Sequence, residues 1–282
     1  MTTTLIARSA TTSRTRLRPG LWAATLFLAL IVLAALFPGL LTEGSPADSE
    51  VLSALQGPGA EHLLGTDANG RDIFTRIVYG ARPSLLTGLG ATALAVVCGT
   101  LLGLLAALGG RIADEIVMRL VDVVLSLPSL LLALLILSVT GPGAVGTLYA
   151  IALYTIPVYA RLIRVQTMVI RRSGYVEAAR SLGLGNAHVI ARHILPNAFA
   201  PLLVLATIEV GTALVAASSL SFLGFGPQPP APEWGAMLAG GRDYFGIAWW
   251  VAVFPGLAIT LTVLSITVTG RWLQRRMEGR AA

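Results

Sequence analysis

The sequence predicts an all-α membrane protein with six transmembrane helices and both termini in the cytoplasm. Hydrophobic residues make up 55% of the 282 residues and charged residues only 12%, whereas soluble domains carry about a quarter charged residues. The apolar residues gather in six runs, and a transmembrane helix needs about 20 such residues. A soluble enzyme and a disordered chain are therefore disfavoured, because so few charges cannot cover a water-facing surface.

The six expected spans lie at residues 21–41, 84–108, 120–139, 148–160, 199–220 and 247–269. Helices are expected because a backbone in hydrocarbon must satisfy its polar groups within its own segment. The fourth run is short and contains Pro157, but Arg161 at its end can snorkel to the interface and extend it. The first run follows several arginines, as in a secretory signal. No small-residue cleavage site comes after it, so it is expected to stay as a helix.

The distribution of the arginines predicts the orientation, since all 20 basic residues are arginine. One side of the membrane holds Arg8, Arg14, Arg16, Arg18, Arg111, Arg119, Arg161, Arg164, Arg171, Arg172, Arg180, Arg192, Arg271, Arg275, Arg276 and Arg280. The other side holds only Arg71, Arg76, Arg82 and Arg242. The arginine-rich side is expected to be cytoplasmic.

The expected organisation follows from these spans. A cytoplasmic tail at 1–20 leads into the first helix at 21–41 and an external loop at 42–83. A core of five helices at 84–270 contains a cytoplasmic loop at 161–198 and an external loop at 221–246, and residues 271–282 form a second cytoplasmic tail.

The chain lacks the motifs of common catalytic and metal sites. Without lysine it cannot form a P-loop, and neither an HExxH motif nor a histidine pair four residues apart occurs. The single cysteine, Cys98, excludes an intramolecular disulfide. Residues 67–72 resemble a calcium loop, but Arg71 takes a ligand position. We therefore expect no catalytic residue, no metal and no bound cofactor.

Two further patterns have simple explanations. The net charge of +6 is attributed to arginines beside anionic lipid, so nucleic-acid binding is not expected. The glycines at Gly88 and Gly90 fit a loose dinucleotide pattern, but they lie inside a span, where close helix packing explains them better.

The segment at 161–198 contains a short predicted helix. Residues 175–183 are expected to form it, with Gly183 as its stop, followed by a turn at 184–187 and a second helix that ends at Leu195-Pro196-Asn197. A helix that is polar on one side and small on the other suits docking in a groove of a partner. From composition alone, a solvated linker is an equal alternative.

The pattern Glu177-Ala178-Ala179-x3-Gly183, with Leu195-Pro196 twelve residues later, resembles the EAA loop of ABC-importer permeases. Residues 64–72 and 80–85 are similar to the first external loop of dipeptide, oligopeptide and nickel permeases, and residues 220–235 are similar to their last. The likeness covers about 20–275 and fits the second, six-helix permease of such systems. This chain departs from the family pattern at Ala217, where many relatives have glutamate.

The resemblance implies a type I ABC-importer permease fold in the bacterial inner membrane. It also implies a homologous second permease, two ATPase subunits or one fused double ATPase that bind ATP and Mg, and an external solute-binding protein. The expected cargo is a peptide, with a nickel chelate or haem as alternatives; an ion-coupled secondary transporter is the competing class. The implied ATPase-coupling residues are Tyr175, Glu177, Ala178, Ala179, Arg180, Gly183, Leu195 and Pro196.

Ionisable residues inside spans are candidates for function. Asp122 is expected to pair with Arg119 three residues away, with a transport role as the alternative. Glu209 could face the pathway or hydrogen-bond across helices. Candidate contacts for the external binding protein are Asp67, Arg71, Asp72, Gln228 and Trp234.

Overall fold

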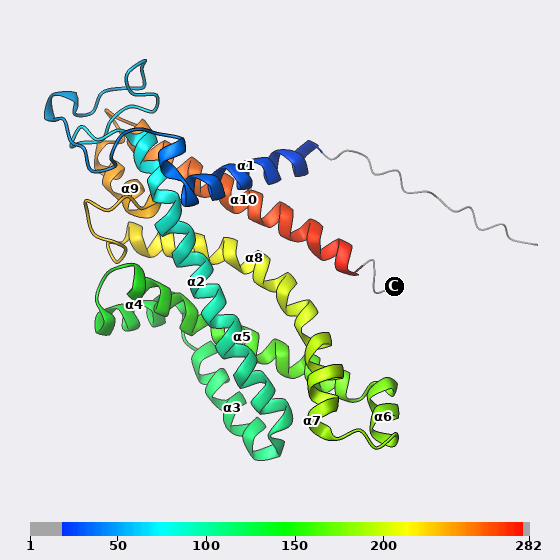
Figure 1. Ribbon diagram of the computed structural model, residues 1–282. Coiled ribbons are helices and arrows are strands. Elements are labelled where there is room, and N and C mark those ends of the chain that lie inside the picture. Colours follow the sequence, from blue (N-terminus) through cyan, green and yellow to red (C-terminus); the bar gives the residue numbers. More distant parts are fainter. Residues whose placement is uncertain (1–18, 279–282) are drawn as a thin grey trace, which may run out of the picture.

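The computed structural model describes residues 19–278, and that range contains helices and no strands (Figure 1). The α-helices are α1 (Pro19–Leu36), α2 (Ile73–Leu108), α3 (Gly110–Leu125), α4 (Ser129–Thr140), α5 (Ala144–Arg171), α6 (Gly174–Ser181), α7 (Asn186–Val189), α8 (Leu195–Phe222), α9 (Trp234–Gly241) and α10 (Trp250–Glu278). Five helical segments are long and apolar enough to cross a membrane, and α3 with α4 would make a sixth span. The predicted all-α membrane fold is confirmed. Residues 1–18 and 279–282 of the expected tails, with their arginines, lie outside the described residues.

The third expected span is wrong as a single helix. The chain forms α3 and α4, which meet at an angle of 95°. Pro128 explains the break, because its ring has no N–H to donate and disfavours helical backbone at the residue before it. The helical part also begins ten residues earlier than expected, at Gly110. α3 is amphipathic, and the charged residues on its polar face interrupt the apolar run that predicted the span.

The second span begins earlier than the sequence predicts. Asp72 caps α2, since its carboxylate accepts a hydrogen bond of 2.7 Å from the backbone N–H of Thr75. The expected external loop at 42–83 therefore ends at Asp72, and eleven of its residues are helical. The charges of Arg76 and Arg82 and the ring of Pro83 hid this first part of α2 from a search for apolar runs.

The fourth and fifth spans are also longer than expected. α5 has 28 residues and continues past Arg161 to Arg171. The second helix of the 161–198 loop does not end at Leu195-Pro196-Asn197, because α7 continues through a π-helical turn at Ile190–Ile194 into α8. Pro196 lies just after this π-helical turn, at the second residue of α8.

Small residues bring the core helices close together. A Cβ atom at Gly99 would lie 2.5 Å from the Tyr159 Cβ atom, and one at Gly103 would lie 2.5 Å from the Ala160 carbonyl oxygen. These glycines allow α2 to pack directly on the backbone of α5. Gly90 packs against a side chain instead, since its Cβ would lie 2.6 Å from a methyl group of Leu148. The close packing expected at Gly88 and Gly90 is therefore confirmed at Gly90.

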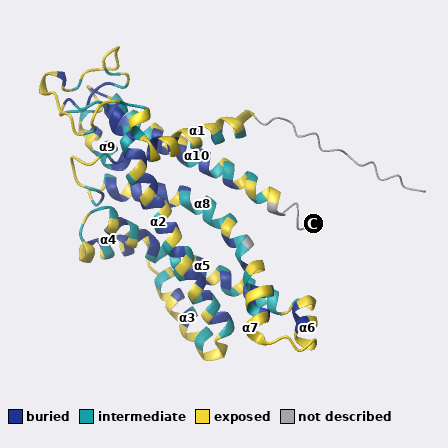
Figure 2. Cartoon of the chain, in the orientation of Figure 1, coloured by how far each residue is buried: buried dark blue, intermediate teal, exposed yellow. Residues whose placement is uncertain are grey.

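The short helices and the long loops gather at two ends of the helix bundle (Figure 1). The α6 end carries α6, α7 and the far part of α3, and the α9 end carries α9 and the loops before α2 and after α8. α1 lies beside α10 and α2, on the periphery of the other spans. Burial is dense along α2 and beside α9, whereas the turn between α6 and α7 is exposed (Figure 2).

Candidate functional site

The α6 hairpin consists of α6, the turn at 182–185 and α7. Gly183 occupies the left-handed region, with φ of +82°. The N–H of Leu184 bonds the carbonyl of Ala179, and the N–H of Gly183 bonds that of Arg180. This pair of bonds is a Schellman motif, which requires the left-handed residue that glycine adopts without strain. The predicted helix stop at Gly183 is therefore confirmed.

A small apolar cluster holds the hairpin together. Val176 and Ala179 of α6 are buried against Val189 and Ile194, which lead into α8. Half-buried Ile170 at the end of α5 packs on the same cluster. The hairpin thus packs on the end of α5 and on the segment that leads into α8, which together form its stem.

The other face of α6 is exposed. Tyr175, Glu177, Ala178 and Arg180 lie there, and Gly183 is exposed in the turn. The carboxylate of Glu177 has no hydrogen bond or ion pair with any of the residues 19–278. Of the remaining predicted coupling residues, Ala179 is buried, Leu195 is half-buried and Pro196 is exposed.

Sequence reasoning missed one element of this surface. Leu182 is 82% exposed and Leu184 is 38% exposed, on either side of Gly183. With Tyr175 they add exposed apolar area to the same hairpin that carries Glu177. The signal was present in the sequence as two leucines in a turn, where polar residues are usual.

Arginines of α5 tie the stem of the hairpin to its neighbours. Arg164 forms a two-bond ion pair with Asp114 of α3, in which Nη2 lies 2.6 Å from Oδ2. Arg171 donates a hydrogen bond to the carbonyl oxygen of Ala107 at the end of α2. These contacts connect the base of the hairpin to α2 and α3.

The expected pairing of Asp122 with Arg119 is wrong. Asp122 pairs with Arg161 of α5, with 2.5 Å between Oδ1 and Nη2. The bend between α3 and α4 lets α3 lie along α5, and this brings an arginine 39 positions away within reach.

Glu209 is half-buried in α8. Its carboxylate accepts a hydrogen bond of 2.7 Å from the hydroxyl of Thr212, one turn later on the same helix. Within residues 19–278 it makes no hydrogen bond to another helix, so the cross-helix alternative finds no support in this range. A place on the transport pathway stays a prediction.

The candidate contacts at the α9 end fall into two groups. The amide of Gln228 is exposed and donates to the carbonyls of Gly224 and Gly226. Trp234 is fully buried, and its indole N–H donates to the carbonyl of Ile77 over 2.9 Å. A contact between Trp234 and a binding protein is therefore wrong, because its side chain anchors α9 to α2.

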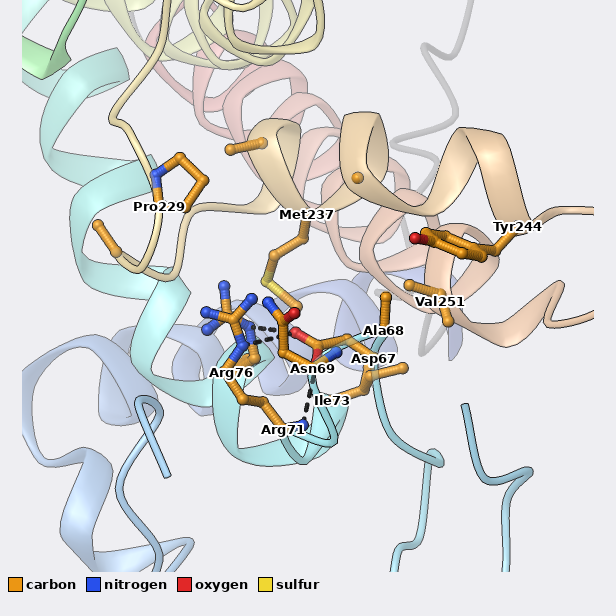
Figure 3. A pocket seen from close by; sticks show the side chains of 13 residues that line it. Asp67, Ala68, Asn69, Arg71, Ile73, Arg76, Pro229, Met237, Tyr244 and Val251 are labelled. Carbon is orange, nitrogen blue, oxygen red and sulfur yellow. Dashed lines mark hydrogen bonds and ion pairs between the residues drawn. The ribbon is translucent and has the colours of Figure 1, made fainter. Parts of the chain in front are cut away.

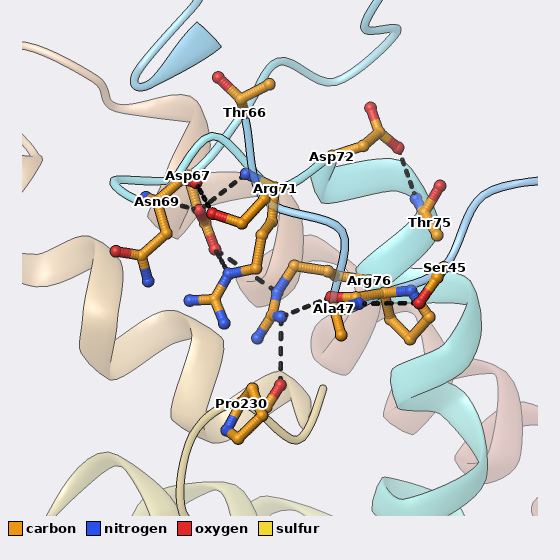
Figure 4. A network of polar contacts seen from close by, with 12 residues as sticks. Ser45, Ala47, Thr66, Asp67, Asn69, Arg71, Asp72, Thr75, Arg76 and Pro230 are labelled. Carbon is orange, nitrogen blue, oxygen red and sulfur yellow. Dashed lines mark hydrogen bonds and ion pairs between the residues drawn. The ribbon is translucent and has the colours of Figure 1, made fainter. Parts of the chain in front are cut away.

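Asp67 and Asp72 make contacts within the loop before α2, and their role as contacts for a binding protein stays a prediction, as does that of Arg71. Asp72 caps α2 and also lies 3.1 Å from His62. Asp67 accepts hydrogen bonds from the backbone N–H groups of Asn69 and Arg71 and pairs with the Arg71 guanidinium over 2.9 Å (Figure 4). Between residues 19 and 278 no three His, Cys, Asp or Glu side chains form a metal-binding group.

Arg76 is the residue of this region that sequence reasoning used only for topology. Its side chain is 6% exposed, and its guanidinium lies 3.6 Å from Asp67 and donates to the carbonyls of Pro46 and Pro230 (Figure 4). Arg76 thereby joins the loop before α2 to the loop before α9. The pattern Asp67-x3-Arg71-x4-Arg76 was the available signal.

Known proteins resemble this chain over most of its length. The family model described as binding-protein-dependent transport system inner membrane component matches residues 99–281. The dipeptide transport system permease protein DppC of Alkalihalophilus pseudofirmus is 44% identical, with 88% of this chain and 81% of that protein covered. The di/tripeptide permease DppC of Pseudomonas aeruginosa is also 44% identical, with 90% and 86% covered.

More distant relatives agree. The glutathione transport system permease protein GsiD of Escherichia coli is 40% identical, with 90% of this chain and 84% of that protein covered. Among solved structures, the MetNI methionine ABC transporter in an inward-facing conformation matches with a TM-score of 0.58 and 19% identity, over 72% of this chain and 96% of that one. This structural match confirms the predicted fold. The chain therefore belongs to the family of binding-protein-dependent transport system inner membrane components, the permease subunits of ABC importers, whose ATPase activity lies in partner subunits.

Proposed function

We propose that this chain forms half of the pathway through which an ATP-driven importer carries short peptides, and that α6 couples the pathway to the ATPase. The observation that carries the proposal is the exposed face of α6, where the carboxylate of Glu177 lies without a partner among residues 19–278. The exposed Leu182 follows in the turn at the end of the same helix. A docking surface of this kind combines apolar contact area with a charge that a partner can pair.

The partners of the proposed complex are a homologous second permease, two ATPase subunits or one fused double ATPase, and an external solute-binding protein. ATP and Mg are bound by the ATPase subunits, and this chain binds no cofactor. When ATP closes the ATPase pair, α6 is carried with it. Because α6 packs against the ends of α5 and α8, its movement rocks these helices and opens the pathway on the other side. Such coupling requires nucleotide to bind the two conformations with different affinity.

The proposed location is the bacterial cytoplasmic (inner) membrane, with the α6 end and both termini in the cytoplasm. Arg161, Arg164 and Arg171 of α5, Arg172 directly after it and Arg180 of α6 lie towards that end. The positive-inside rule assigns such a side to the cytoplasm.

A short peptide is the proposed cargo because permeases for dipeptides, di/tripeptides and glutathione are similar to this chain. A nickel chelate and haem are alternatives, since the binding protein largely selects the cargo. An ion-coupled secondary transporter would need its own coupling-ion site. The family to which the chain belongs disfavours that class.

The test is uptake by proteoliposomes that contain this chain, its second permease and the ATPase subunits. With the binding protein outside and ATP inside, labelled dialanine should accumulate, and an excess of nickel–histidine or haem should not compete. Uptake by this chain alone, driven by an ion gradient, would contradict the proposal.

A further inference from the structure

A cavity of about 270 Å³ lies at the α9 end (Figure 3). The turn that precedes α2 lies on one side of it, and α9 lies on the other. Asp67, Asn69, Arg71 and Arg76 form its polar wall. The opposite wall is mainly apolar and comes from the loop before α9, from α9 and from the start of α10: Pro229, Ala231, Ala236, Met237 and Val251. Ligand pockets for drug-sized molecules begin at about 300 Å³, so this cavity has room for about one amino-acid residue.

The polar wall has more positive than negative charge. The guanidinium groups of Arg71 and Arg76 both face the single carboxylate of Asp67 (Figure 4). The three side chains are only 12%, 6% and 15% exposed, respectively. Because a poorly solvated charge is stable only when it is paired, the surplus cation favours an anion in the cavity.

Donor groups for such an anion are available. Both oxygens of Asp67 are engaged, by two backbone N–H groups and by the two arginines. Arg71 uses only its Nε atom, so in residues 19–278 neither of its terminal nitrogens has a hydrogen-bond partner. Two parallel N–H groups of a guanidinium match the two oxygens of a carboxylate.

The geometry points to a carboxylate-binding subsite in this cavity, which accepts a carboxylate carried on one small apolar residue, such as the C-terminal residue of a short peptide. Arg71 binds the carboxylate, Arg76 supplies the second positive charge, and Met237 and Val251 contact the apolar side chain. The assignment of a peptide as the source rests on the proposed function, whereas the carboxylate chemistry rests on the cavity itself.

The test is ligand binding to the purified complex in nanodiscs, without ATP and without the binding protein. The probe is N-acetylalanine, which carries one carboxylate and one methyl side chain, and the reference is N-acetylalanine amide. Saturation-transfer NMR should show binding of the carboxylate at least about tenfold tighter than that of the amide, as expected for charged hydrogen bonds. Equal binding of the two probes would overturn the assignment.

Two variants test the two walls. Arg71→Gln should abolish the preference for the carboxylate. Arg82→Gln removes an exposed arginine of α2 outside the cavity and should leave the preference unchanged.

Gly240→Leu should weaken binding about tenfold or more by filling the cavity. A Cβ atom at Gly240 meets no atom within 4 Å, so this variant should fold. Gly246→Leu has equally open surroundings outside the cavity and serves as its control. Wild-type binding by either cavity variant would overturn the assignment.

A second measurement, capture of the binding protein by the complex, separates binding of a small carboxylate from docking of the binding protein. If Arg71→Gln weakens capture of the binding protein but leaves binding of N-acetylalanine intact, the arginine serves protein docking and the assignment is wrong. Because neither measurement uses ATP, a complex that binds N-acetylalanine but imports nothing would refute the proposed function and leave the subsite standing.

Discussion

Arg161 on α5 and Asp122 on α3 form an ion pair with 2.5 Å between Nη2 and Oδ1, although 39 positions separate them in sequence. One helical turn further along α5, Arg164 pairs with Asp114 of the same helix α3. The two pairs hold α3 along α5 on the stem of the α6 hairpin. We therefore expect a movement of the hairpin to carry α3 with it.

The two ion pairs should differ in strength. In double-mutant cycles of unfolding in mixed micelles, Asp122→Asn with Arg161→Gln should give a coupling of about 0.2–1 kcal/mol, because both side chains are more than half exposed. Asp114→Asn with Arg164→Gln should give about 1.5–3 kcal/mol, because this pair has two hydrogen bonds and less exposure. Arg119→Gln is the control, and a coupling of Arg119 to Asp122 above that of Arg161 would contradict the pairing.

Cysteine accessibility tests the orientation. In a Cys98→Ser background, cysteines at Ser49 and Pro230 should react with an impermeant maleimide added to intact cells, because both positions are exposed at the α9 end. A cysteine at Gly174, exposed at the α6 end, should react only after the membrane is permeabilised. Labelling of Gly174→Cys in intact cells, without labelling of Ser49→Cys, would reverse the proposed topology.

The backbone at Gly183 predicts a specific order of substitutions. With φ of +82° and no atom within 4 Å of the position that a Cβ atom would take, the penalty of a substitution is conformational, about 1–2 kcal/mol for an ordinary residue. Gly183→Val should therefore loosen the hairpin and increase amide hydrogen exchange in α6. Gly183→Asn should behave nearly as the wild type, because asparagine tolerates this conformation.

Gly185 provides the matched control for Gly183. It lies in the same turn, with equally open surroundings but φ of −62°. Gly185→Val should leave exchange in α6 unchanged. If both valine variants raise exchange equally, left-handed backbone is not the reason that Gly183 is needed.

Local sequence signals predicted much of the fold. Long apolar runs predicted the spans, because hydrophobicity is a property of each segment by itself. The EAA-like pattern with Gly183 predicted α6 and the glycine that ends it. The first eleven residues of α2 were missed because Arg76 is paired within the fold, so a residue that reads as solvent-exposed in sequence is buried.

The remaining errors concern tertiary contacts. Asp122 meets Arg161 instead of Arg119 because α3 packs along α5, and no spacing rule within one helix contains that information. Trp234 reads as an exposed loop residue but inserts beside Gly80 of α2, where a Cβ atom would lie 3.0 Å from the indole. The cavity beside α9 was likewise invisible, because its walls come from segments more than 150 positions apart.

The central claim is that the exposed face of α6 transmits the ATPase stroke. The variant that tests it combines Glu177→Ala with Gly183→Val. It removes a carboxylate that has no partner among residues 19–278, and it strains the turn that follows α6. Loss of a charged hydrogen bond to the ATPase alone costs about 1.5–3 kcal/mol. The control combines Glu61→Ala with Gly185→Val, which removes an exposed carboxylate at the α9 end and alters the turn without strain.

The most direct measurement is the rate of cargo-stimulated ATP hydrolysis by the purified complex in nanodiscs, with the amount of co-purified ATPase determined in the same preparation. The Glu177→Ala, Gly183→Val complex should lose stimulation by the loaded binding protein, by at least about tenfold, or should lose the ATPase subunits altogether. Binding of cargo to the binding protein should stay intact, and the control variant should behave as the wild type. A double variant that retains its ATPase subunits and wild-type stimulation would show that α6 is not the coupling element.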